Sequence, residues 1–340
     1  MSEARRAIGP VFDHLAALTD DRGLFEHALH AVPRPEHGYC VDDAARALVV
    51  VCREPQPSPQ LLRLGRQYLN FVLSAIDVDG ACHNRMSVNG DWTDVASLGD
   101  WWGRAVWGLG VAAVHAPTDG MRARALRGFR TAARRRSPHT HAMAFAALGA
   151  GEILLDDHHE QTARALLHDS VQAIGLGQSD TWPWPEPRLR YGNGSLVEAL
   201  LLAGHALPDP ALFARAQRLL AFLLQMETRD GHLSVTPTSG RGPNETGPAF
   251  DQQPIEVAAL ADACARAYTL TSDPTWLIGV RSAWRWFTGD NDSGTVMFDP
   301  STGGGYDGLE CDGHNLNQGA ESTLALLSTA QHARSLAGQR

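Results

Sequence analysis

The sequence has few features that would tie it to a membrane or to an oxidising compartment. It contains no apolar run approaching the roughly 18 residues that a spanning helix needs. The N-terminal segment MSEARRAIGP carries charge but no following apolar stretch, so it does not read as a secretory signal. Five cysteines, at positions 40, 52, 82, 264 and 311, are odd in number and far apart, which favours reduced thiols. We expect a cytoplasmic protein.

The sequence also lacks the features of a nucleic-acid or nucleotide-binding protein. Its net charge of −9 disfavours a polyanionic partner. No glycine-rich phosphate loop is present, so we expect no nucleotide and no other cofactor or resident metal.

Two kinds of helix alternate along the chain. One kind is apolar on nearly every face and rich in Ala, Gly and Leu, which is typical of buried helices. These segments begin at residues 41 (VDDAARALVVV), 99 (GDWWGRAVWGLGVAAV), 140 (THAMAFAALGAGEILL), 192 (GNGSLVEALLLAG), 254 (PIEVAALADACARAY) and 317 (NQGAESTLALLSTA).

The other kind is amphipathic, with Arg and Gln on one face, as expected of outer helices. These segments begin at residues 58, 120, 160, 209 and 273, and a sixth is expected from residue 6 (RAIGPVFDHLAALT). Ser58, Asp209 and Asp273 each precede a proline, which predicts an N-cap followed by proline at the first helical position.

The connections repeat as well. Asp-Gly turns with short strand-like flanks, as in METRDGHLSVTP, tend to follow the outer helices, whereas the connections from inner to outer helices are short. A repeat of about 57 residues is what a ring of helical hairpins would give. We therefore predict an all-α protein whose residues 1–340 form a single (α/α)6 barrel, with β-hairpin loops on the active-site face; an irregular helical bundle is the alternative.

This architecture would bring polar residues near the starts of the inner helices to one end of the ring. Asp42 and Asp43 open the first of them, and either one is explained as an N-cap, which leaves the other for catalysis. Glu198 and Glu256 lie in apolar helices, where an unpaired carboxylate is costly, so each must be paired or must line a wet cavity, and we favour the cavity.

Aromatic side chains, amides and carboxylates in one cleft indicate a carbohydrate ligand, because aromatic rings cover the apolar faces of sugars and the polar groups bind hydroxyls. The predicted substrate-binding residues are His37, Tyr39, Asp42, Trp101, Arg104, Trp182, Trp184, Tyr191, Asn193, Gln252, Gln253, Tyr306, Asn315 and Asn317. Hydrolysis of a glycoside needs a carboxylic acid and a second carboxylate. The catalytic candidates are Asp43, Asp100, Glu186, Asp251, Asp307 and Glu321. We expect a glycoside hydrolase that acts on a short oligosaccharide or glycoside, most simply with inversion.

Five motifs also resemble a known group. HGYCVDDAARAL, HNRMS with GRAVWGLG, WPWPEPRLRYGNGSLVEALL, FDQQPIEVAAL and TGGGYDGL with NLNQGAESTLALL together resemble a bacterial domain fused to, or encoded beside, glycosyltransferases. The resemblance covers nearly the whole chain. It implies an (α/α)6 toroid similar to glycoside hydrolases and sugar epimerases, and a functional association with a glycosyltransferase.

Other interpretations stay open at this point. A sugar epimerase would use histidine bases, for which His141 is the candidate, and a non-catalytic sugar-binding module would use the same cleft. His37, Cys40, Cys311 and His314 have the ligand types of a zinc site. CVDDAARAL also partly matches the acid motif of class II terpene cyclases, with Cys40 replacing its first aspartate.

Overall fold

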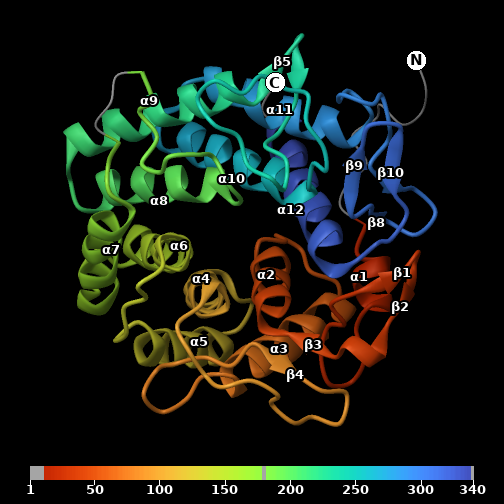
Figure 1. The fold of residues 1–340 in the computed structure, drawn as a ribbon. Coiled ribbons are helices and arrows are strands. Elements are labelled where there is room, and N and C mark those ends of the chain that lie inside the picture. The colour runs from red at the N-terminus through yellow and green to blue at the C-terminus, as the bar shows by residue number, and fades with distance from the viewer. Residues whose placement is uncertain (1–10, 178–180, 338–340) are drawn as a thin grey trace.

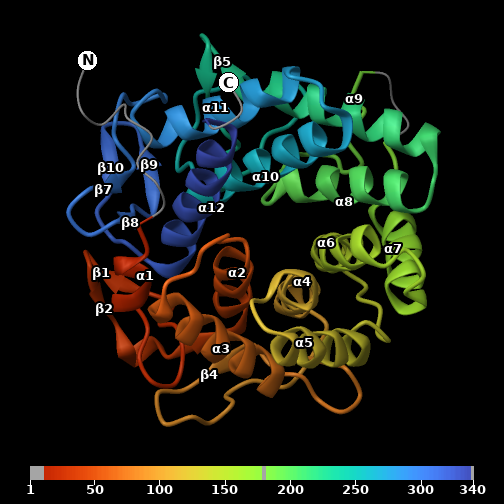
Figure 2. The ribbon, with the colours of Figure 1, turned by 180° about the vertical axis from the view of Figure 1, so that it is seen from behind.

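The ring of helical hairpins predicted from the sequence is the observed fold. The structure is a computed structural model that describes residues 11–177 and 181–337. Figure 1 shows the hairpins following one another around a ring in chain order, so that the last inner helix lies beside the first. The same closure is seen from behind in Figure 2.

Six apolar helices line the inside of the ring, and each packs against the next along the chain. They are α2 (Val41–Cys52), α4 (Asp100–His115), α6 (Thr140–Asp156), α8 (Asn193–Ala206), α10 (Pro254–Thr271) and α12 (Ala320–Ala337). All six predicted inner helices are thus confirmed.

The amphipathic helices form the outer layer, each against its preceding inner helix. They are α3 (Pro59–Ser74), α5 (Asp119–Ala132), α7 (Gln161–Ile174), α9 (Pro210–Met226) and α11 (Thr275–Phe287). The sixth, α1 (Asp13–Ala17), is shorter than predicted; the first residues of the expected helix, before residue 11, lie outside the described part of the chain.

The predicted caps are present at two of the three helices. The Ser58 hydroxyl accepts a hydrogen bond from the amide of Leu61, and the Asp209 carboxylate accepts from Ala211 and Leu212. Helix α11 begins later than expected, with Pro274 rather than Asp273 at the N-cap position. The Asp273 carboxylate still accepts from the Thr275 amide at 2.9 Å.

Glycine lets neighbouring inner helices approach closely. A Cβ atom on Gly103 of α4 would lie 2.2 Å from the carbonyl oxygen of Ala142 in α6. One on Gly110 would lie 2.3 Å from the carbonyl oxygen of Gly149. Any larger residue at these positions would force the two helix backbones apart.

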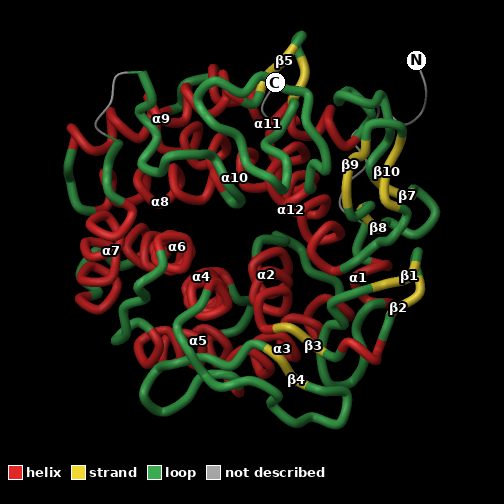
Figure 3. Tube along the Cα trace, viewed as in Figure 1, coloured by secondary structure: helices red, strands yellow, loops and turns green. Residues whose placement is uncertain are grey.

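Short antiparallel strand pairs decorate the loops, as Figure 3 shows in yellow. They are β1 (Ala28–Leu29) with β2 (Val32–Pro33), β3 (Tyr39–Cys40) with β4 (Arg85–Met86), β5 (Thr228–Arg229) with β6 (His232–Leu233), β7 (Phe298–Asp299) with β8 (Gly304–Gly305), and β9 (Gly308–Glu310) with β10 (Gly313–Asn315). The predicted Asp-Gly turn at Asp230–Gly231 joins β5 to β6. One 3-10 turn, η2 (Pro35–His37), precedes β3.

Within the described residues, no helix combines the length and the apolar character needed to cross a bilayer.

Candidate active site

A polar cavity of about 420 Å³ opens where four inner helices begin. We call it the cleft cavity. Helices α2, α4 and α12 and the residue before α10 contribute to its wall, together with three loops. Its lining contains seven of the predicted site residues: Asp42, Asp43, Asp100, Trp101, Gln253, Asp307 and Glu321. These seven predicted residues therefore lie together at one end of the ring.

Arg46 is the centre of the charged wall of the cleft cavity. Its guanidinium donates to Asp43 at 2.5 Å, to Glu321 at 2.7 Å and to Asp42 at 3.0 Å. The 3.6-residue helical period places Asp42, Asp43 and Arg46 on one side of α2, and ring closure adds Glu321 from α12. Arg46 and Asp43 are buried, whereas the Glu321 side chain is 39% exposed.

Neither aspartate caps α2, contrary to the expectation that one of them would. The helix begins at Val41, so both lie in its first turn. Asn84 takes the capping role instead: its side-chain oxygen accepts from the Cys40 thiol at 3.2 Å and from the Asp42 amide at 3.4 Å. The pairing of β3 with β4 brings Asn84 to this place, and both aspartates are left to interact with arginine.

The charged wall holds more negative than positive charge. Asp42, Asp43 and Glu321 face Arg46, and Arg104 adds a second guanidinium 3.3 Å from Asp42. Burial raises the pKa of Asp43 to about 7, against the opposing effect of Arg46 and with a further contribution from Asp42 and Glu321. Because these three carboxylates share two guanidiniums, we expect the group to retain one proton near neutral pH. The proton is most favourable on Asp43, the most deeply buried of the three, because burial penalises the charged form.

A second polar group lies on α4 and α6. Asp100 accepts a hydrogen bond from the Tyr191 hydroxyl, and the Tyr191 ring stacks on His141 at a centroid distance of 4.4 Å. Burial lowers the pKa of His141, whereas the charges of Glu186 and Asp100 act in the opposite direction. The Nε2 atom of His141 and one carboxylate oxygen of Glu186 are buried and have no hydrogen-bond partner among the described residues.

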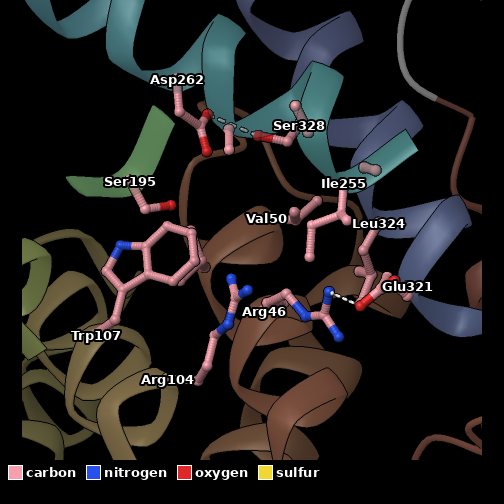
Figure 4. A pocket seen from close by; sticks show the side chains of 14 residues that line it. Arg46, Val50, Arg104, Trp107, Ser195, Ile255, Asp262, Glu321, Leu324 and Ser328 are labelled. Atoms are coloured by element: carbon pink, nitrogen blue, oxygen red, sulfur yellow. Dashed lines mark hydrogen bonds and ion pairs between the residues drawn. The ribbon is translucent and has the colours of Figure 1, made fainter. Parts of the chain in front are cut away.

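A narrow void continues from the charged wall along the axis of the ring. It has a volume of about 30 Å³ and lies between Arg46 and Glu321 on one side and Asp262 and Ser328 on the other (Figure 4). The Arg104 guanidinium lies over the Phe145 ring, 3.7 Å from its centroid, which keeps a buried cation fixed at the side of this void. Arg104 thus lines the axial void and lies beside Asp42, outside the lining of the cleft cavity.

Asp307 also lines the cleft cavity, in the loop before β9 and near the start of α12. Burial raises its pKa, although its carboxylate accepts from the Gly319 amide at 2.8 Å. On α4, Trp101 donates from its indole to the carbonyl of Cys82 at 2.8 Å, which fixes the orientation of its ring beside the cavity.

Several residues predicted to bind substrate are part of the protein core. Tyr39 is 1% exposed, stacks on Phe25 and donates to Asp20, because β3 turns its side chain inward. Trp184 is 2% exposed and, like Trp182, packs against Phe222 of outer helix α9. Two polar residues from the same prediction, Asn193 and Gln252, are also buried. Asn193 forms a hydrogen bond with Glu256, and Gln252 forms one with Asp292.

The other predicted residues lie outside the lining of the cleft cavity. His37 contacts His27 edge to face at its rim, and Tyr306 stacks on His314 at 4.0 Å. Asp251 lies beside Gly308 of β9, with burial raising its pKa. The amide groups of Asn315 and Asn317 accept from the backbone of Asn317 and His30 respectively, so they hold the loop before α12 in shape.

Glu198 and Glu256 do not reach the cleft cavity, the alternative that we favoured; both have partners, which is the other alternative. Glu256 accepts from Asn193 and from the backbone at the start of α8. Glu198 pairs with Arg266 at 3.3 Å and lines a cavity at the other end of the ring. A buried carboxylate in an inner helix therefore does not by itself predict a position in the cleft cavity.

The four residues of the suggested zinc site do not come together. Within the described residues, Glu26, Cys40 and Asp43 are the one group of three or more potential ligands whose atoms lie within 4.8 Å of one another. Each of these is already engaged: Glu26 with Arg85, Cys40 with Asn84, and Asp43 with Arg46. Burial also raises the pKa of the Cys40 thiol, which opposes formation of a thiolate ligand.

Loop residues complete the cleft cavity and were not among the predicted site residues. Glu26, His27, Asn84 and Arg85 line it, from the loops before β1 and around β4. Asn84 and Arg85 lie in the HNRMS motif, so that motif was the signal that pointed to them.

The fold is shared with structures of carbohydrate-active enzymes. A sugar epimerase from a ruminal bacterium superposes with a TM-score of 0.70 at 16% identity, over 94% of this chain and 95% of that one. The cellobiose 2-epimerase of Spirochaeta thermophila gives 0.65 at 14% identity, over 95% and 93%. A GH76 alpha-mannanase from Bacteroides thetaiotaomicron gives 0.59 at 11% identity, over 88% of both chains.

The protein has the (α/α)6 glycosidase-like toroid fold. No family model and no curated protein matches the sequence. At these identities the likeness concerns the fold, and hydrolases and epimerases share it.

Proposed function

We propose that the protein is a glycoside hydrolase whose acid and base groups face each other across the cleft cavity. The observation that carries the proposal is the Arg46 cluster, in which three carboxylates share one guanidinium. Such a cluster retains a proton at a pH where an isolated carboxyl group has lost it. A proton held near neutral pH is what a glycosidic leaving oxygen requires.

The acid in this proposal is the coupled pair of Asp43 and Glu321. Asp43 is almost fully buried, whereas Glu321 is exposed to the cleft cavity, and Arg46 contacts both. Burial raises the pKa of Asp43 to about 7, so the cluster holds a proton near neutral pH. Glu321 would contact the substrate, and the cluster would supply the proton to the glycosidic oxygen.

The base or nucleophile in this proposal is Asp100. It lines the same cavity from α4 and is oriented by the hydroxyl of Tyr191. In an inverting enzyme this carboxylate would activate a water molecule on the opposite face of the sugar; the two carboxyl groups are then about 6.5 to 9.5 Å apart. Trp101 would cover an apolar sugar face, while Gln253 and Asp307 would bind hydroxyl groups.

The test is a hydrolysis screen on short oligosaccharides and aryl glycosides. We expect Asp100→Asn and Glu321→Gln to lower kcat by about 100-fold or more, the usual contribution of a general acid or base. Asp119→Asn is the control, because this carboxylate is 94% exposed on outer helix α5. Wild-type turnover in both cleft variants, with the fold intact by circular dichroism, would rule out this assignment.

A sugar epimerase is the second candidate, and it is favoured by His141. This side chain is 6% exposed, its Nε2 atom has no partner, and burial lowers its pKa, so it is held as a neutral base. The epimerases among the structural neighbours add weight to it. Incorporation of solvent deuterium next to the carbonyl carbon of a reducing sugar, lost in His141→Asn, would establish this activity in place of hydrolysis.

The association with a glycosyltransferase is retained as a proposal that rests on the motif resemblance. In that setting, a protein that binds oligosaccharides in the screen without converting them would be a non-catalytic binding module. The Asp100→Asn and Glu321→Gln variants would then weaken binding of the same sugars.

A further inference from the structure

A second polar cavity lies at the end of the ring opposite the cleft cavity. Two adjoining hollows, of about 510 and 440 Å³, share Arg53, Arg266, His332 and Ser335 in their lining. Arg53 directly follows α2, His115 is the last residue of α4, and Asp156 is the last residue of α6. The two hollows, which we call the reverse-end cavity, therefore lie where inner helices end.

The charges of the reverse-end cavity are paired with one another. Arg53 and His332 both contact Asp262, at 2.9 and 2.5 Å. On the other side of the cavity, Arg266 contacts both Glu152 and Glu198, and His115 lies 3.1 Å from Glu152. Because both arginines already have carboxylate partners, the cavity offers no free guanidinium to an anionic ligand.

A buried hydrogen-bond acceptor in this wall has no partner. Gln331 is 6% exposed, and its amide nitrogen donates to the carbonyl of Val50 at 2.9 Å, which fixes the orientation of the group. Its side-chain oxygen makes no hydrogen bond within the described structure, and the residue lines the reverse-end cavity. A buried acceptor without a donor is unfavourable by about 1 to 3 kcal/mol. A ligand hydroxyl that donated to the Gln331 oxygen would remove this unfavourable contribution.

The reverse-end cavity is separate from the cleft cavity. The void between them, bounded by Arg46 and Glu321 at one end and by Asp262 and Ser328 at the other, measures about 30 Å³ (Figure 4). That volume is small beside those of the cleft cavity and the reverse-end cavity, so the axis of the ring is constricted between them.

We infer that the reverse-end cavity is a second binding site, for a small neutral carbohydrate. Paired arginines and carboxylates alternate donors with acceptors around the cavity, which suits adjacent hydroxyl groups. The hydroxyl-bearing side chains of Thr269, Ser272 and Ser335 extend this surface, and Tyr268 adds an aromatic ring. The site does not depend on hydrolysis in the cleft cavity.

The test compares binding with the cavity open and filled. Glucose, mannose and cellobiose, with glucosamine and glucuronate as charged counterparts, are titrated by calorimetry and by saturation-transfer NMR. Ser335 is exposed on α12 and lines both hollows, so Ser335→Trp fills the cavity without entering the core. Ser335→Ala is the matched control.

We expect Ser335→Trp to weaken binding of a neutral sugar at least tenfold, with Ser335→Ala unchanged. Gln331→Leu should weaken it by about five- to tenfold, the value of one neutral hydrogen bond. Hydrogen exchange should slow, on addition of the sugar, in residues 262–272 and 328–335 of the wild type. Unchanged binding in Ser335→Trp, absence of binding in the wild type, or a preference for the charged sugars would each overturn the inference.

The same experiment separates this inference from the proposed function. Turnover in the cleft cavity should be unaffected by Ser335→Trp and abolished by Asp100→Asn. Absence of turnover in the hydrolysis screen would overturn the proposed function but not binding at the reverse-end cavity. Absence of binding at the reverse-end cavity would overturn this inference but not hydrolysis in the cleft cavity.

Discussion

At the scale of single residues, the decisive feature is the ratio of carboxylates to guanidiniums around Arg46. A buried cation with one partner forms a closed pair, whereas Arg46 has three. The surplus negative charge makes the cluster respond to pH, and it makes the arginine indispensable to its neighbours. Both consequences can be measured without knowing the substrate.

The stability of the protein should depend on the ionisation of Asp43. Burial raises the pKa of Asp43 from 3.8 to about 7, so the folded protein holds a proton that the unfolded chain releases. This contribution is complete below about pH 4 and is lost as the pH rises through 7, by up to about 1.4 kcal/mol per pH unit. In urea unfolding at several pH values, the free energy of unfolding of Asp43→Asn should therefore rise relative to that of the wild type between pH 4 and 7. A difference independent of pH would contradict this.

Removal of the shared cation should destabilise the fold strongly. Arg46→Met leaves three carboxylates in the wall of the cavity without their common partner, and we expect a loss of about 3 to 5 kcal/mol in the free energy of unfolding. Arg63→Met on outer helix α3 is the control, since Arg63 is exposed and its loss should cost less than about 0.5 kcal/mol. Equal effects of the two substitutions in denaturant titrations would show that Arg46 is not structurally required.

At the scale of elements, helices α4 and α6 approach each other closely. Glycine residues on the facing sides bring one backbone against the carbonyl groups of the other. This places the first turns of both helices, which carry Asp100 and His141, side by side at the cleft end. The spacing of the two helices therefore sets the geometry of the second polar group.

A methyl group at this contact should be costly. Gly103→Ala would place its Cβ 2.2 Å from the Ala142 carbonyl oxygen, and overpacking of this kind usually costs about 1 to 3 kcal/mol. Gly120→Ala is the matched control: nothing lies within 4 Å of its Cβ, so alanine should stabilise α5 by up to about 1 kcal/mol. Thermal unfolding of the two variants should shift in opposite directions, and a shift in the same direction would argue against the contact.

The elements were predictable because they depend on local pattern, whereas much of the site was not. The apolar periodicity of residues 41–52 or 254–271 is contained in the sequence itself, and so is the cap at Ser58. The side on which Tyr39 lies depends on the pairing of β3 with β4. The burial of Trp184 depends on its contact with Phe222, which is distant in the sequence. Such pairings join residues tens of positions apart, and no periodicity specifies them.

At the scale of the whole molecule, contacts between α12 and α2 close the ring. Arg46 with Glu321, Gln331 with Val50, and Arg334 with Glu54 join the two ends of the described chain. The Arg334 guanidinium contacts both oxygens of Glu54 at 2.9 Å. Because every inner helix has two inner neighbours, loss of any one hairpin would expose the apolar faces of two others.

We therefore predict that the chain unfolds as one domain. Tryptophan fluorescence and far-ultraviolet circular dichroism should give coincident transitions in guanidinium chloride. Arg334→Met leaves the buried Glu54 carboxylate without its bidentate partner, and it should lower stability by about 1 to 3 kcal/mol without splitting the transition. Two separated transitions would show that part of the ring unfolds on its own.

The narrowness of the axial void also determines how a polymer can engage the protein. Because the axis is constricted to a void of about 30 Å³ between two larger cavities, the ring is a cup, and we expect that a polysaccharide does not thread through it. A long chain would have to present one of its ends to the cleft, or bend into it, and the released fragment would leave by the mouth through which it entered. For the proposed hydrolase, each cleavage of such a chain would then need its own association step.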